Sequence, residues 1–223
     1  MLISQVELPV SEAEQVAVFY RDVLGLPVRA AGHAVEVQIG PTTLVLRRQE
    51  VMPGAYHCAI TIPADRFDQA KDWLRQRVAL LERDGQDEFR LGAPWNSQSV
   101  YFTGPDGIIL ELIARHDLPA ASSGPFASTD LLRISEVGLA VPDVPLAVSR
   151  LRDTLRLPVF GTAAADFTPL GDPNGLLIVV RRGRPWFPTT SVTPSAGPVG
   201  VTIEAVVGRR SLRVAQDGQI EGL

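Results

Sequence analysis

Hydrophobic and polar positions alternate along the chain in a pattern that changes repeatedly between strand-like and helix-like. Residues 3–10 (ISQVELPV) alternate as in a half-buried strand, and an amphipathic stretch over residues 11–24 follows. Shorter strand-like segments come next, and the same order returns from residue 56. The further strands expected are residues 33–40, 42–48, 78–85, 99–104 and 107–114. The pattern predicts a unit of one strand, one helix and about three strands.

The boundaries of the two helices carry recognisable end signals. Ser11 followed by Glu14 has the spacing of a capping box, and Gly25 stands where a helix often ends in a left-handed residue. Asp65 is the expected cap of the second helix. These signals predict helices that begin near residues 11 and 65.

An internal repeat relates the two halves of the chain. ISQVELPV at 3–10 matches ISEVGLAV at 134–141, and RDVLGLPV at 21–28 matches RDTLRLPV at 152–159, both at an offset of 131 residues. Self-similarity at a fixed offset indicates a repeated structural unit. The unit occurs clearly three times, and a fourth copy that begins at 197–207 is too short to hold a helix.

The repeat and a change in composition divide the chain into two predicted domains. The stretch LPAASSGPFASTD at 118–130 is rich in Pro, Gly and Ser, as linkers are. We therefore expect a first domain over 1–118, a linker over 119–131 and a second domain over 132–223.

Composition limits the possible functions. The net charge of −4 gives no electrostatic reason to expect nucleic acid as a partner. No apolar run approaches the roughly 18–20 residues that a membrane span needs, and the first residues do not resemble a signal peptide. The one cysteine, Cys58, excludes an internal disulfide. We expect a cytoplasmic protein without nucleic-acid or membrane partners.

One charged residue stands out in the segment YFTGPDGIILELIA at 101–114. Glu111 lies in the middle of a nearly continuous apolar run that reads as a buried strand. An isolated ionised carboxylate is very costly to bury, so such a group is usually paired or bound to a metal. The sequence therefore predicts a specific partner for Glu111.

The paired units, with FYRDVLGLPV at 19–28 in the first and YFTGPDGIILELIA at 101–114 closing the second, resemble the vicinal oxygen chelate superfamily. That superfamily includes glyoxalase I, bleomycin-resistance proteins and extradiol ring-cleavage dioxygenases. The resemblance implies an α+β fold, in which tandem βαβββ modules pair into open, barrel-like mixed sheets. It implies two glyoxalase-like domains, the last module truncated, and a divalent metal.

The resemblance also implies which residues hold the metal. The ligand positions fall on Gln5, His57 and Glu111, and the fourth position falls on Val45, which cannot bind a metal. Three protein ligands with open positions are typical of a catalytic site. These ligand types suit Fe(II), Mn(II), Zn(II) or Ni(II).

The corresponding positions of the second half predict no metal site there. They fall on Glu136, Val179, Pro198 and, loosely, Glu221. A valine and a proline cannot serve as ligands. We therefore expect 132–223 to be a structural or substrate-covering companion domain.

The expected activity acts on a small molecule that chelates the metal through two oxygens. Glu111 can be both ligand and base, and Tyr101 is a candidate acid–base group. Residues expected in the substrate pocket are Tyr56, Trp95, Asn96 and Gln98.

Three functional interpretations stay open. The first is a metal-dependent lyase, isomerase or oxygenase, and the second is specifically an extradiol dioxygenase. The third is a non-catalytic binding protein of the resistance type. The loop RRGRPWFPT at 181–189 reads either as an anion-binding loop or as a solvated loop with an aromatic anchor. Both a monomer and a homodimer are compatible with two paired domains in one chain.

Overall fold

The fold is a mixed α+β structure built from four successive units. The computed structural model describes residues 1–119 and 124–222. The first unit contains β1 (Leu2–Val10), α1 (Ala13–Val18), the π-helical turn η1 (Phe19–Val23), β2 (Val28–Ala31), β3 (Ala34–Ile39) and β4 (Thr42–Arg48). The second contains β5 (His57–Ile62), η2 (Ala64–Arg66), α2 (Phe67–Arg75), β6 (Phe89–Leu91), β7 (Ser97–Thr103), η3 (Pro105–Gly107) and β8 (Ile109–Arg115).

The third and fourth units are shorter than the first two. The third contains β9 (Arg133–Val141), α3 (Val144–Leu155), β10 (Phe167–Asp172) and β11 (Gly175–Arg181), and is preceded by η4 (Ser128–Asp130). The fourth contains β12 (Val199–Ala205), β13 (Gly208–Val214) and β14 (Ile220–Glu221). The tandem modules and the truncation of the last one are therefore as the sequence predicts, although the third unit has two strands after its helix rather than three.

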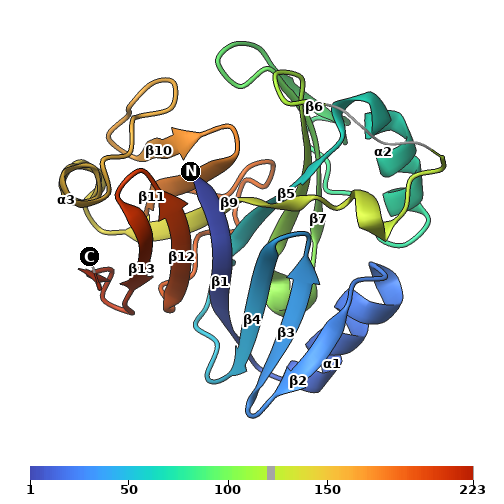
Figure 1. The fold of residues 1–223 in the computed structure, drawn as a ribbon, viewed down its shortest axis with the longest axis horizontal. Coiled ribbons are helices and arrows are strands. Elements are labelled where there is room, and N and C mark those ends of the chain that lie inside the picture. The colour runs from blue at the N-terminus through green and yellow to red at the C-terminus, as the bar shows by residue number, and fades with distance from the viewer. Residues whose placement is uncertain (120–123, 223) are drawn as a thin grey trace.

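Two seven-stranded sheets draw strands from both halves of the chain. The first sheet has the order β14-β13-β12-β1-β4-β3-β2, and the second has the order β10-β11-β9-β5-β8-β7-β6. Figure 1 shows the blue strands of the first unit continuing sideways into the red strands of the last. The first unit is thus paired with the fourth and the second with the third.

The predicted division at a linker over 119–131 falls partly outside the described residues. Each sheet joins its two units through an antiparallel pair of first strands, β1 with β12 and β5 with β9. Within the units, β1 pairs with β4, β5 with β8 and β9 with β11, all parallel. The domain boundaries themselves stay a prediction.

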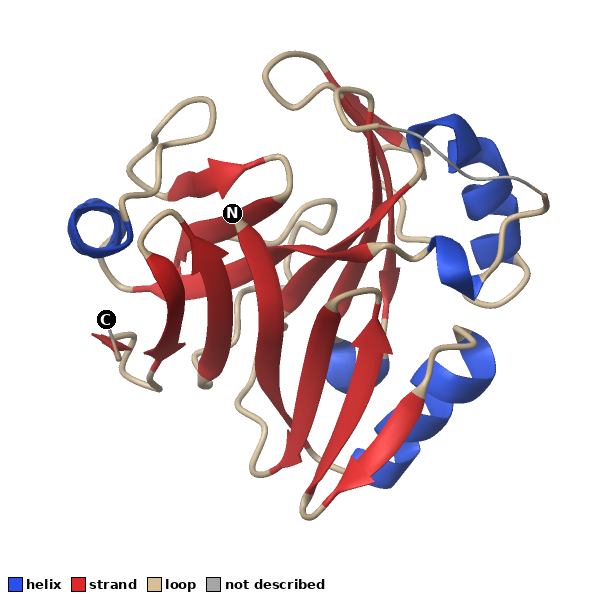
Figure 2. Ribbon diagram, in the orientation of Figure 1, coloured by secondary structure: helices blue, strands red, loops and turns tan. Residues whose placement is uncertain are grey.

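One face of the second sheet belongs to the common core. Cys58, Ile60 and Ile62 of β5 lie in the same buried cluster as Val6 and Leu8 of β1. Because successive side chains of a strand point to opposite faces, His57 and Ala59 lie on the other face. The helices lie at the outside of the sheets in Figure 2, and α3 packs its Leu151 and Leu155 into the same core. The free face of the second sheet is the face that holds the site described below.

Local signals define the helix ends only in part. Gly25 has φ of +65°, which is the expected left-handed conformation after the first helix. Ser11, by contrast, bonds through its backbone N and its Oγ to the Asp106 carboxylate at 2.9 and 2.6 Å, and makes no capping box. Asp65 lies inside η2, and the cap position of α2 makes no side-chain hydrogen bond.

Residues 78–85, which were expected to form a strand, lie in turns and isolated bridges instead. Asp84 and Gly85 both have positive φ, at 53° and 75°, and Arg83 and Gln86 exchange backbone hydrogen bonds around them. The polar turn therefore interrupts the extended chain. No helix among the described residues is long and apolar enough to span a bilayer.

Candidate functional site

Three neighbouring strands bring a histidine and two glutamates together. On β5, Ala59 is in register with Glu111 of β8 on one side and with Glu136 of β9 on the other. His57 precedes Ala59 by two residues and so faces the same side of the sheet. Each of the three ionisable side chains offers one ligand atom, and these atoms all lie within 4.8 Å of one another. The small side chain of Ala59 leaves the space between the two carboxylates open.

His57 is held in one orientation by the backbone. Its Nδ1 lies 3.2 Å from the carbonyl oxygen of Ile109, which can only accept a hydrogen bond. The proton of the neutral ring is therefore on Nδ1, and Nε2 carries the lone pair 3.6 Å from Glu111 Oε2. Burial lowers the pKa of His57 to about 4, although the Ile109 carbonyl opposes that shift. The ring is therefore neutral and available as a ligand at physiological pH.

The two carboxylates differ in their surroundings. Burial, with the nearby charge of Glu136, raises the pKa of Glu111 to about 8, and the Ser99 hydroxyl, the charge of Arg115 and the Tyr101 hydroxyl oppose the rise. Burial also raises the pKa of Glu136, to about 6, where the charge of Arg115 opposes it. Glu111 is thus the carboxyl that keeps a proton near neutral pH, and Glu136 is the one that is ionised.

Arg115 is bonded directly to Glu136 and favours its ionised form. It is only 1% exposed, and its Nη2 donates a hydrogen bond to Glu136 Oε1. The guanidinium lies 5.4 Å from the ring centre of Trp95 and 5.9 Å from that of Phe160. Its Nε and Nη1 have no hydrogen-bond partner among the described residues. The pair fixes one oxygen of Glu136 and leaves the other free.

These residues face a cavity of about 250 Å³. His57, Glu111 and Glu136 line it, together with Tyr101, which is in register with Glu111 on the neighbouring strand. The aromatic residues in its wall are Phe89, Trp95, Tyr101, Phe167, Trp186 and Phe187. A concave, mostly apolar cavity with a few convergent polar groups is the usual form of a small-molecule site.

The loop after β11 closes the cavity from the second half of the chain. Trp186 is 5% exposed, donates its indole N–H to the Ala55 carbonyl at 2.8 Å, and lies with its ring centre 5.1 Å from that of His57. Gly138 makes room for it, because a Cβ there would come within 2.4 Å of the indole. This part of the segment 181–189 is therefore an aromatic anchor, and its position against His57 makes it part of the site.

The equivalent face of the first sheet carries no comparable cavity in the described chain. Gln5 of β1 is in register with Thr43 and Thr202, and Glu7 occupies the place that corresponds to Ala59. Glu7 is in register with Val45 of β4, and its Oε1 lies 2.8 Å from Nε of Arg47, two residues further along that strand. The hollow beside this ion pair has a volume of only about 10 Å³. A long charged side chain fills the space that Ala59 leaves empty in the second sheet.

The residues proposed from the sequence are therefore divided between two places. His57, Glu111, Tyr101 and Trp95 line the cavity, whereas Gln5 lies in the other sheet. The expectation that Gln5 meets Glu111 assumed that the first two units pair with each other. The unit that pairs with the second is the third, so Glu136 stands beside Glu111 instead.

Three further residues proposed for the pocket do not line it. Gln98 is next to Ser99 and so faces away from the cavity, toward Glu88. Asn96 donates to the Asp117 carboxylate at 2.7 Å near the surface. The Tyr56 hydroxyl lies against Gly197, where a Cβ would come within 2.0 Å of it.

Glu136, Arg115 and Trp186 were not proposed as site residues. Glu136 aligns with Gln5 in the repeat, and it is a buried carboxylate in an apolar strand, the same signal that singled out Glu111. The last-strand position of the third unit was expected at Val179. The residue that lines the cavity there is Ile178, which is in register with Gly138. The repeat therefore contains a signal for Glu136, although the ligand set of the second unit is completed by a residue of the third.

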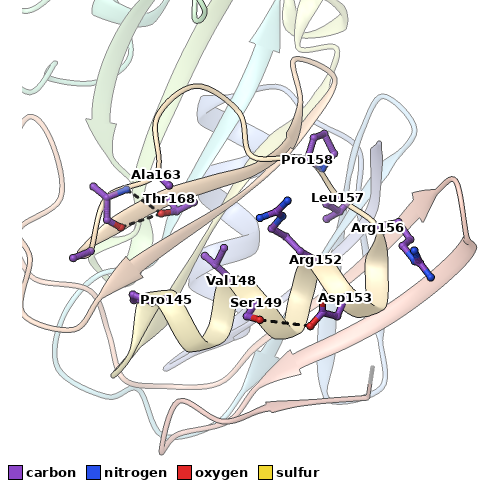
Figure 3. Close-up of a pocket in the computed structure, with 12 residues that line it drawn as sticks. Pro145, Val148, Ser149, Arg152, Asp153, Arg156, Leu157, Pro158, Ala163 and Thr168 are labelled. Carbon is purple, nitrogen blue, oxygen red and sulfur yellow. Dashed lines mark hydrogen bonds between the residues drawn. The ribbon is translucent and has the colours of Figure 1, made fainter.

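A second hollow lies away from this site. It is an open groove of about 790 Å³ between α3 and the segment 158–168. Figure 3 shows Arg152 extending from the helix into it and Asp153 hydrogen-bonded to Ser149. Among the described residues, the one group of three or more potential metal-ligating acids, histidines or cysteines is His57, Glu111 and Glu136. The groove therefore does not share the chemistry of the cavity.

Comparison with known proteins identifies the fold. No protein-family model matches the sequence, and no curated protein matches it. A solved variant of glyoxalase I from Zea mays is 15% identical, and the match covers 98% of this chain and 90% of that one with a TM-score of 0.58. The chain therefore has the same fold as this glyoxalase I structure.

A second solved structure has the same fold over a smaller part of its length. It is a protein from Bacillus subtilis provisionally named a dioxygenase, 17% identical, with a TM-score of 0.58. The match covers 81% of this chain but 63% of that one. The two matches confirm the glyoxalase-type fold with its tandem units. Because both sequence identities are low, they do not carry an activity over to this chain, and the activity is argued from the site.

Proposed function

We propose that the protein is a metal-dependent enzyme that binds a divalent cation through His57, Glu111 and Glu136. The observation that carries the proposal is the convergence of these three buried donors within 4.8 Å at the wall of an aromatic cavity. The fold supports it, since the superfamily it resembles holds a divalent metal at the corresponding strands.

The donor set suits a metal in three respects. The Ile109 carbonyl holds the His57 proton on Nδ1, as an outer partner of a ligating histidine usually does, and directs Nε2 toward the carboxylates. Glu111 and Glu136 are both buried, and in the described part of the chain Arg115 is the one buried arginine beside them. When both carboxylates are ionised, one negative charge is left uncompensated, and a bound cation would neutralise it. Three protein ligands also leave coordination positions free for a substrate.

The ion, when bound, would supply Lewis-acid stabilisation of the charge that develops on a substrate chelated through two oxygens. Arg115 holds Glu136 in place, and aromatic side chains form most of the cavity wall. Glu111 is placed to take a proton from the substrate on a carboxyl oxygen and to return it, because it lines the cavity between His57 and Tyr101. The Tyr101 hydroxyl, whose pKa burial raises well above its usual value, can donate a hydrogen bond there but does not ionise.

A lyase or isomerase fits this donor set better than a ring-cleavage dioxygenase. Non-haem iron oxygenases typically use two histidines and one carboxylate, whereas this group has one histidine and two carboxylates. Of the other histidines, His33 and His116, neither lines the cavity. The extradiol alternative therefore has the weaker support.

The test is metal analysis of the full chain purified without added metal or chelator, followed by titration calorimetry with Mn(II), Zn(II), Ni(II) and Fe(II). Near-stoichiometric binding that is lost in His57→Ala, Glu111→Ala and Glu136→Ala supports the proposal. Gln5→Ala is the matched control and should bind metal as the unmodified protein does. Absence of binding for all four ions would overturn the proposal.

The Arg115–Glu136 ion pair favours a second candidate, a non-catalytic protein that binds small molecules without a metal. The guanidinium already neutralises one of the two carboxylates. Under this alternative the same cavity binds a ligand, and the three alanine variants leave the affinity for added divalent ions unchanged.

A further inference from the structure

The solvent side of the cavity is formed by a loop that the metal centre does not use. In the segment 182–189, Arg184 and Phe187 line the cavity together with the buried Trp186. The Arg184 side chain is 33% exposed and Phe187 is 39% exposed, whereas the three metal-binding candidates are nearly inaccessible. Arg184 and Phe187 therefore line the part of the cavity that solvent reaches.

The walls of the cavity are built for a flat ligand. Phe89, Tyr101 and Phe187 form one cluster, with ring centres 4.6 to 5.7 Å apart in edge-to-face arrangements. Trp95 contributes a second wall, edge-to-face with Phe160 at 5.1 Å. Edge-to-face and offset contacts are the arrangements that aromatic rings prefer. A planar aromatic ligand can extend both clusters by such contacts.

Arg184 is the one positively charged residue among those that line the cavity in the described chain. Its guanidinium lies 4.7 Å from the ring centre of Phe167, which fixes its position over the wall. Its Nε approaches the Asp166 carboxylate at 3.3 Å, and this pair is partly exposed on both sides. Exposed ion pairs are weak, so an incoming anion can share the guanidinium at little cost. Among the described residues no hydrogen bond engages its two terminal nitrogens, so they can donate to the anion in a forked geometry.

We propose that the cavity binds a small planar aromatic acid, with its ring between the two aromatic clusters and its anionic group on Arg184. The proposal names a substrate class for the metal-dependent enzyme proposed above, and it rests on that function for the reaction itself. Binding of the ring and of the anionic group can be measured independently of metal binding. A volume of about 250 Å³ limits the ligand to one or two fused rings. Arg184 is the residue that selects an acid over its neutral analogue.

The experiment compares 2-naphthoate with 2-naphthamide, which share a ring system and differ in charge. Binding to the full chain is followed by calorimetry and by quenching of tryptophan fluorescence. The acid should bind more tightly than the amide. Arg184→Gln should weaken the acid by roughly tenfold, the loss expected for one charge-assisted hydrogen bond, and leave the amide unchanged. Arg181→Gln is the matched control, since Arg181 is exposed at the end of β11, directly before this segment, and does not line the cavity.

The ring is tested by Phe187→Leu, which should weaken acid and amide by the same factor. Equal affinities for the two probes, an Arg184→Gln variant that binds the acid as tightly as before, or no binding of either probe would each overturn the inference. Metal binding is recorded in parallel on the same preparations. If the protein binds no metal but still binds the acid more tightly than the amide, the metal proposal fails and the inference stands. If it binds metal but shows no preference for the acid, only the inference fails.

Discussion

Replacing Glu111 by Gln should remove a fall in stability of the metal-free protein between pH 6.5 and 8. The pKa of Glu111 is raised by burial to about 8 in the folded chain, against about 4.3 in an unfolded one. Across this window the folded state carries a proton that the unfolded state lacks. Stability therefore decreases as pH rises, with a slope that starts near −1.4 kcal/mol per pH unit and flattens toward pH 8.

The neighbouring groups do not obscure this window. His57, whose pKa burial lowers to about 4, is neutral in the folded chain above pH 6.5. In the unfolded chain its pKa is about 6.5, so it loses about half a proton across the window and opposes the effect of Glu111 only weakly. Glu136, with a pKa of about 6, is mostly ionised in both states. The expected loss from pH 6.5 to 8 is then on the order of 1–2 kcal/mol, and Glu111 is its main source.

The assay is urea unfolding in the presence of a chelator at half-unit steps of pH, for the unmodified protein and for Glu111→Gln. Glu82→Gln serves as control because Glu82 is an exposed carboxylate outside the site. The control should keep the fall in stability, and Glu111→Gln should be flat. A stability that is constant or rises with pH in the unmodified protein would refute the reasoning.

Three further predictions test the parts of the site separately. Gly138→Ala should lower the free energy of unfolding by about 1–3 kcal/mol, the usual cost of overpacking, and shift tryptophan emission, because its Cβ meets Trp186. Arg115→Met should cost about 3–5 kcal/mol in a denaturant titration by leaving Glu136 buried and unpaired, and adding Glu136→Leu should recover most of that loss. Gln5→Ala should leave the thermal stabilisation by added divalent metal unchanged, since Gln5 lies in the other sheet.

The local structure was largely readable from the sequence because it depends on short-range signals. The repeat correctly marked β1, β5 and β9 as the first strands of three units, and Gly25 adopts the left-handed conformation expected of it. Ser11 shows the limit of such reasoning. Its side chain has two satisfactory partners, its own helix and Asp106, and only the tertiary structure determines that it takes the second.

The assembly of the site was not readable in the same way. Pairing of β1 with β5 or with β12 satisfies the same alternation of apolar and polar residues, so the pattern cannot choose between them. The choice decides whether Gln5 or Glu136 stands beside Glu111. A slip of one residue in the register of β11 likewise turns Ile178 toward the cavity in place of Val179. Such slips leave no trace in the sequence pattern when the strand is apolar throughout.

The pairing of β1 with β12 also determines what a piece of this chain would expose. Cutting the chain after residue 118 would remove β9 from β5 and β12 from β1. Each sheet would be opened along its middle, leaving two long strands with unsatisfied backbone N–H and C=O groups. Such edges recruit strands from other molecules. The two halves therefore protect each other from aggregation, and a fragment that contains one intact half of the repeat is expected to associate with copies of itself.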